Sequence, residues 1–114
     1  MGKLTGRFFT TGSGVKTYEI YEATRHILPE IAALLQAEFG YTPQALIDGI
    51  DVFYLDCEKE GSQITIGWDC WSGCFIMSVV DTANSEQVIR EIGDFLSTKL
   101  ESLGDYYDES LAKT

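Results

Sequence analysis

Two alternating segments between residues 52 and 69 constrain the fold of this chain more than any other feature. Apolar residues occupy every second position in both segments, which is typical of strands with one buried face. The first apolar set is Phe53, Leu55 and Cys57, and the second is Ile64, Ile66 and Trp68. Matched in reverse order, each residue of one set lies opposite a residue of the other, beginning with Cys57 opposite Ile64. This register leaves Glu60-Gly61 as a two-residue loop, a length that hairpins favour, so we predict an antiparallel hairpin.

Two longer segments have helical periodicity instead. The first precedes Gly40, which is the expected helix end, and Pro29 must lie in its first turn. The second begins near Asn84 or Ser85 and ends at Gly104. Their apolar stripes are Ile27, Ile31, Leu34, Leu35 and Phe39 in the first, and Val88, Ile92, Phe95, Leu96, Leu100 and Leu103 in the second. Stripes of this kind predict two amphipathic helices.

Three further segments complete the predicted order of elements. Residues 15–22 alternate less cleanly and are read as a strand of the same sheet. Thr42 followed by Pro43 is a helix-start pattern, so a short helix ending at Gly49 is expected. Residues 74–80 are apolar at nearly every position, which is typical of a central strand. The register of this strand stays open, with either Cys70 or Asp69 opposite Cys74.

These elements predict an α+β two-layer sandwich in the order β-α-β-β-β-α. The antiparallel sheet has three to four strands, and two long helices pack on one of its faces. The length of 114 residues fits a single domain over residues 1–114. Residues 1–14 and 105–114 are expected to be flexible or peripheral.

The formal net charge of −10 excludes some classes of partner. Phosphate backbones are repelled by an acidic surface, so we expect no nucleic acid as partner. No apolar run reaches the ~18 residues of a membrane span. The first residues have no apolar segment typical of a secretory signal. We therefore expect a soluble cytoplasmic protein with reduced cysteines and no membrane contact.

The three cysteines and the single histidine give little support for catalysis. Cys57, Cys70 and Cys74 are weak candidates for metal binding, because a second close pair of ligands is missing. A redox pair is disfavoured, since Cys70 and Cys74 are one residue too far apart and lie in a strand-turn-strand context. His26 near a helix start is expected to be a surface or capping imidazole. We predict no cofactor and no catalytic residue.

The acidic residues of the predicted hairpin point instead to recognition. The alternation places Asp56 and Glu58 on the outward face of the first strand and Asp69 on that of the second, while Glu60 lies at the turn. Like charges on one sheet face cost stability unless a basic group lies opposite or water screens them. Trp71, at the next turn, is a residue type typical of contact anchors. The expected partner-binding residues are Asp56, Glu58, Glu60, Asp69 and Trp71.

The favoured function is a small binding protein that docks on a basic protein partner, and not an enzyme. By analogy of charge and size, such a protein could be an inhibitor or an immunity-type protein against a basic toxin. One alternative is a small cysteine-dependent enzyme or metal-binding domain that uses Cys57, Cys70 and Cys74. Another is a homo-oligomeric structural protein, for instance a homodimer, whose wet sheet face pairs with its own copy. The net charge argues against stacking this acidic face on itself, whereas a contact through an edge strand or a helix avoids the repulsion.

Overall fold

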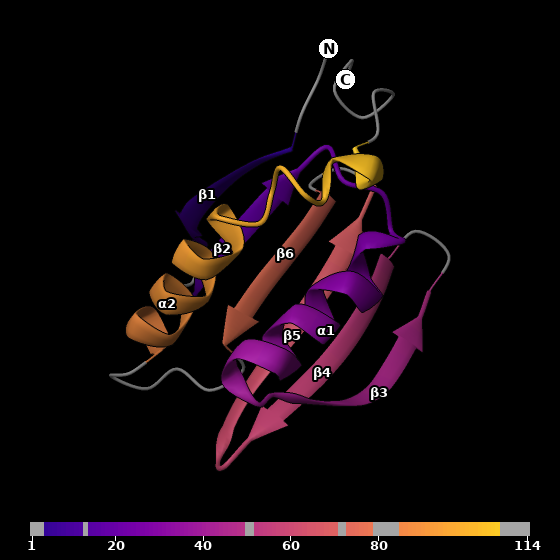
Figure 1. Ribbon diagram of the computed structural model, residues 1–114. Helices are drawn as coiled ribbons and strands as arrows, with labels where there is room; N and C mark the ends of the chain where they lie inside the picture. The colour runs from indigo at the N-terminus through magenta and orange to yellow at the C-terminus, as the bar shows by residue number, and fades with distance from the viewer. Residues whose placement is uncertain (1–3, 13, 50–51, 71–72, 79–84, 108–114) are drawn as a thin grey trace.

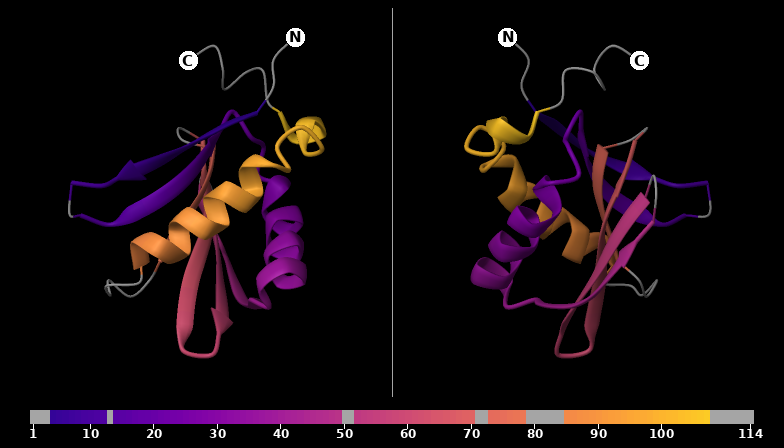
Figure 2. Two further views of the ribbon diagram at one scale, coloured as in Figure 1. Left: turned by 60° about the vertical axis from the view of Figure 1, so that its left-hand side comes forward. Right: turned by 90° about the vertical axis from the view of Figure 1, so that its right-hand side faces the viewer.

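The computed structural model describes residues 4–12, 14–49, 52–70, 73–78 and 85–107. Its strands are β1 (Thr5–Thr10), β2 (Lys16–Tyr21), β3 (Thr42–Asp48), β4 (Val52–Lys59), β5 (Ser62–Asp69) and β6 (Gly73–Ser78). They form one six-stranded antiparallel sheet in the order β1-β2-β6-β5-β4-β3 (Figure 1). Helices α1 (Ile27–Phe39) and α2 (Ser85–Ser97) lie on the same side of the sheet (Figure 2), and a 3₁₀ turn, η1 (Gly104–Tyr106), follows α2.

The predicted fold class is wrong in the number and order of its strands. The sheet has six strands and not three to four, and the observed order along the chain is β-β-α-β-β-β-β-α. The two additional strands are β1 and β3, which form the two edges of the sheet. Both edges were missed because neither has the alternating pattern of a half-buried strand.

β3 replaces the predicted short helix for a tertiary reason. Pro43 fits the first turn of a helix, but it is also tolerated in an edge strand, where no neighbour needs its missing N–H group. Thr42 and Pro43 lie opposite Glu58 and Cys57 of β4, and the register shifts between Pro43 and Leu46 before regular pairing resumes. Pairing with β4 therefore outweighs the local helix signal.

The β4–β5 hairpin is confirmed in the predicted register. Its pairs include Cys57 with Ile64, Leu55 with Ile66, and Phe53 with Trp68. Glu60 and Gly61 connect the strands with φ angles of 40° and 85°. Positive φ at both central positions is typical of the turn whose twist matches that of the flanking strands.

β6 occupies the predicted central position, between β2 and β5. Neither of the two registers considered for it is correct, because Trp68 lies opposite Cys74 and Asp69 opposite Gly73. The residue opposite Cys74 is thus shifted by one position from the Asp69 alternative and by two from the Cys70 alternative. Residues 71–72 and 79–84, which include Trp71 and Asn84, lie outside the described residues.

α1 has the predicted bounds, whereas α2 ends earlier than expected. The N–H of Gly40 donates to the carbonyl of Gln36 at 3.0 Å, which ends α1. α2 stops at Ser97, and the Thr98 hydroxyl donates to the Phe95 carbonyl at 2.6 Å. Leu103, which was assigned to the helical stripe, is instead buried in the turns that follow α2.

The core lies between the helices and one face of the sheet. Fully buried members from both layers include Ile20, Ile31, Leu35, Ile64, Ile66, Ile76, Ile92 and Leu96. α1 packs on β5 and β3, and α2 packs on β2, β1 and β6. Among the described residues, no helix lies on the opposite face of the sheet (Figure 2). Neither helix in the described ranges is long and apolar enough to cross a membrane.

Candidate docking face

The helix-free face of the sheet is the best candidate for a functional surface. Side chains alternate between the two faces of a strand, so Phe53, Leu55 and Cys57 share the helical side and the alternate residues of β4 lie on the helix-free side. β5 and β6 follow through their registers with β4. We use the name open face for the outward side chains of these three strands, which include Tyr54, Asp56, Glu58, Thr65, Phe75 and Met77.

An aromatic pair forms the middle of the open face. The rings of Tyr54 and Phe75 meet edge to face with centroids 6.2 Å apart. Gly67 lies between them on β5, opposite both. A Cβ atom on Gly67 would come within 2.3 Å of the Phe75 ring, so only glycine lets this ring lie against the sheet. Tyr54 remains 37% exposed, which leaves aromatic surface available for a partner.

Carboxylates border this pair on the side of the β4–β5 turn. Asp56 is half-buried and accepts a hydrogen bond of 2.7 Å from the Thr65 hydroxyl, directly across the strands. Glu58, two residues further, is exposed, and so is Glu60 at the turn. The hydrogen bond fixes the direction of the Asp56 carboxylate, while the other two carboxylates extend into solvent.

No described lysine or arginine forms an ion pair with a described carboxylate of this group. Lys59, the base closest to them in sequence, lies with its ammonium 5.8 Å from the centroid of the Tyr41 ring. Arg7, Arg25 and Lys99 lie over the rings of Tyr21, Phe53 and Phe95. Lys16 donates to the Thr10 hydroxyl, and Arg90 pairs with Glu86 at 3.7 Å, the one ion pair between two described residues. The carboxylates of the β4–β5 turn therefore keep their negative potential.

The predicted partner-binding residues do not form one cluster. Asp56, Glu58 and Glu60 lie together near the β4–β5 turn. Asp69 lies opposite Val52, four residues along the hairpin from the level of Asp56, which is about 13 Å at strand spacing. Asp69 also makes an interaction of its own, and Trp71 lies outside the described residues. The Tyr54–Phe75 pair lies between the level of Asp56 and that of Asp69.

The structure does not bring the three cysteines together. Cys57 lies opposite Ile64 and Cys74 opposite Trp68, so their levels differ by about 13 Å along β5. All three are free thiols, and Cys70 is only partly buried. Burial raises the pKa of Cys57 to about 11, with a smaller contribution from Asp56, and burial also raises the pKa of Cys74. Within the described ranges, no three His, Cys, Asp or Glu side chains converge on a possible metal position.

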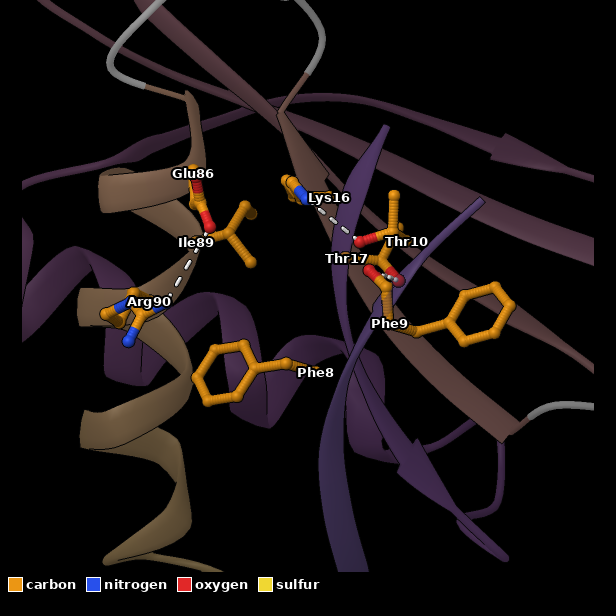
Figure 3. A pocket seen from close by; sticks show the side chains of 8 residues that line it. All are labelled: Phe8, Phe9, Thr10, Lys16, Thr17, Glu86, Ile89 and Arg90. Atoms are coloured by element: carbon orange, nitrogen blue, oxygen red, sulfur yellow. Dashed lines mark hydrogen bonds and ion pairs between the residues drawn. The ribbon is translucent and has the colours of Figure 1, made fainter. Parts of the chain in front are cut away.

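A small cavity of about 140 Å³ lies at the other side of the molecule, between α2 and the β1–β2 hairpin (Figure 3). Phe8 points toward α2 in this view, and Phe9 points to the other side of β1. Lys16 donates to the Thr10 hydroxyl at 3.1 Å on the same hairpin. This region carries basic and aromatic side chains and contrasts with the acidic β4–β5 turn.

A groove of about 340 Å³ lies between the start of α1 and the β3–β4 edge. Leu28, Leu46 and Phe53 supply apolar walls, and the Arg25 guanidinium lies 5.3 Å from the centroid of the Phe53 ring. The groove is lined mainly by carbon atoms with a cation on one wall. It can hold an apolar side chain, but it lies on the helical side and is not part of the open face.

Sequence reasoning missed the aromatic centre of the open face. The alternation that places Asp56 outward places Tyr54 outward as well, but it assigns Tyr54 no role, and Phe75 belongs to a segment that is predicted only as a central strand. Gly67 was the available signal, because a glycine inside a strand pattern marks a close approach of another group. The acidic positions were found because charge on one face of a strand can be read directly from a period of two.

No family model, no curated protein and no solved structure matches the chain. An exposed aromatic centre bordered by unpaired carboxylates combines a desolvated contact with attraction for a basic surface. This arrangement suits recognition of another protein.

Proposed function

We propose that the chain is a protein-binding module that docks on a basic surface of a partner protein through the open face. The Tyr54–Phe75 pair supplies the apolar contact, and Asp56, Glu58 and Glu60 supply the charge that attracts the partner. An inhibitor or immunity-type protein that neutralises a basic partner has this combination of properties.

One observation carries the proposal. The open face has exposed aromatic and carboxylate groups side by side, while no described lysine or arginine forms an ion pair with these carboxylates. Like charges kept close together reduce the stability of the free protein. A basic partner removes this cost, which gives the arrangement a functional reason.

We further propose that the contact takes place in the cytoplasm. The three cysteines are free thiols, with two of them buried. Reduced thiols are typical of a compartment that does not favour disulfides. The partner is then expected in the same compartment.

Site-specific photo-crosslinking in the native host is the first test. A benzophenone side chain replaces Tyr54 on the open face, and in a matched control it replaces Glu101, which is exposed beyond α2. We expect a basic protein to be captured from position 54 and not from position 101. Capture of the same protein from position 101 alone would refute the proposal.

The association rate of the captured partner is the second test. Glu58→Lys with Glu60→Lys changes the charge at the β4–β5 turn, whereas Glu30→Lys with Glu101→Lys makes the same change in net charge at exposed positions on the helical side. We expect the first variant to associate about tenfold more slowly at low salt, because steering depends on where the charge lies. Equal slowing by both variants would show that only the net charge matters.

A further inference from the structure

The two edges of the sheet are protected to different degrees. β3 carries Pro43, a register shift between Pro43 and Leu46, and the charged Asp48 at its end. Proline, bulges and charges are the features by which natural proteins prevent another strand from pairing with an exposed edge. β3 is therefore a poor template for a further strand.

β1 lacks the proline and the register shift, and its one charged residue is Arg7, which lies over aromatic rings. All six of its residues pair with β2 in one uninterrupted register, and the strand contains no proline and no carboxylate. Phe8 and Phe9 point to opposite sides of β1 (Figure 3) and are 48% and 43% exposed. A regular, unprotected edge with apolar side chains on both faces favours the addition of another strand.

We propose that β1 pairs antiparallel with β1 of a second copy of the chain, with Phe8 on the two-fold axis. Arg7 then lies opposite Phe9 of the second copy, and Gly6 lies opposite its Thr10. No charge faces a like charge in this register. Arg7 already lies over its own Phe9 and Tyr21 rings, at 5.8 and 5.1 Å from their centroids. The contact across the axis extends this stacking, because a guanidinium is attracted to aromatic faces.

The distribution of charge favours this edge for self-association. Arg7 and Lys16 lie on the β1–β2 hairpin, and Arg90 lies close by on α2. The acids of the region are balanced locally, since Glu19 is opposite Arg7 and Glu86 pairs with Arg90. Two chains that each carry a net charge of −10 thus meet at a region that is not acidic, with the carboxylates of their β4–β5 turns far from the axis.

The difference between the β1 and β3 edges predicts a dimer that adds no further strands. A two-fold contact between β1 strands uses the same surface on both copies, so it leaves no free β1 edge. The remaining edges are the two β3 strands, which are protected. The sheet therefore grows from six strands to a continuous sheet across the dimer and stops there.

Sedimentation equilibrium of the full chain tests this proposal without any other partner, so its outcome is separate from that of the docking function. We expect a species of twice the 12.7 kDa monomer mass. Phe9→Lys places a cation opposite Arg7 of the second copy at two symmetric positions. We expect the dissociation constant of the dimer to rise by about tenfold or more. Circular dichroism checks that the variant remains folded.

Two further variants serve as controls, one that reverses the charge at position 7 and one that changes the β3 edge. Adding Arg7→Glu to Phe9→Lys should restore the dimer, since unlike charges then face each other across the axis. Leu46→Lys, at a 57% exposed position on β3, should leave the dimer intact. A monomeric wild-type chain would overturn the proposal. So would a dimer that Phe9→Lys leaves intact, one that the double variant does not restore, or one that Leu46→Lys dissociates.

Discussion

At Gly67 the absence of a side chain determines the shape of the open face. The three nearest atoms to a Cβ at this position all belong to the Phe75 ring, at 2.3 to 2.9 Å. Contacts this short cannot persist, so any larger residue must displace the ring. The Tyr54–Phe75 contact forms the aromatic centre, and displacement of the Phe75 ring would break it.

Gly67→Ala should therefore destabilise the protein by about 1–3 kcal/mol, the usual cost of overpacking a well-filled site. Urea denaturation measures the change. Gly12→Ala is the matched control, because a Cβ there meets no atom within 4 Å, and its effect should stay within about 0.5 kcal/mol. In a Phe75→Ala background the cost of Gly67→Ala should disappear; a cost that persists would mean that ring displacement is not its cause.

The buried thiols predict a loss of stability at alkaline pH. The pKa of Cys57 is raised from 9.0 to about 11, and that of Cys74 is raised also, so the unfolded chain loses these protons first. The unfolding free energy should fall between about pH 9 and pH 11, on the order of 2 kcal/mol for Cys57. Urea denaturation across this range checks it. Cys57→Ala with Cys74→Ala should flatten the slope, and an unchanged slope would contradict the assignment to the thiols.

The β4–β5 turn contains a residue whose type does not suit its backbone conformation. Glu60 has a φ of 40°, and residues with a side chain other than Asn or Asp rarely adopt positive φ. Glu60→Asn should raise the unfolding free energy by about 0.5–1 kcal/mol, because Asn-Gly is favoured in this turn. Glu58→Gln removes a charge nearby without this conformational gain and serves as the control. A destabilised Glu60→Asn variant would contradict the account.

The elements that sequence predicts well are those whose local pattern and tertiary environment agree. The β4–β5 hairpin follows from a period of two and a two-residue loop, and α1 follows from its stripe between Pro29 and Gly40. β3 and β1 are edge strands, with one neighbour and mostly exposed side chains. Burial therefore imposes no alternation on them, and pairing with a distant strand decides their conformation.

The carboxylates of the candidate site can be predicted from the sequence, whereas its aromatic contact cannot. The outward carboxylates of β4 could be assigned from the alternation alone, because the hairpin register was determined by its apolar residues. The Tyr54–Phe75 contact joins residues on β4 and β6 across β5, and it depends on the register of β6. That register was the one the sequence left open, so the aromatic centre could not be found.

The whole molecule carries a net charge of −10, concentrated in part on the open face. Self-repulsion of this kind weakens the folded state and is screened by salt. The unfolding free energy should rise by about 1 kcal/mol as sodium chloride shortens the Debye length from ~30 Å to ~3 Å. A variant with Glu58→Gln and Glu60→Gln should show a smaller rise. A stability independent of salt would contradict the view that these carboxylates are unpaired.

Hydroxyl-radical footprinting of the complex with the captured partner tests the docking face most directly, because it reports the solvent access of individual aromatic and sulfur side chains. We predict that binding protects Tyr54, Phe75 and Met77 and leaves Phe39 and Tyr106, on the helical side, unchanged. Protection of Phe39 or Tyr106 with continued labelling of Tyr54 would place the partner on the helices and contradict the account.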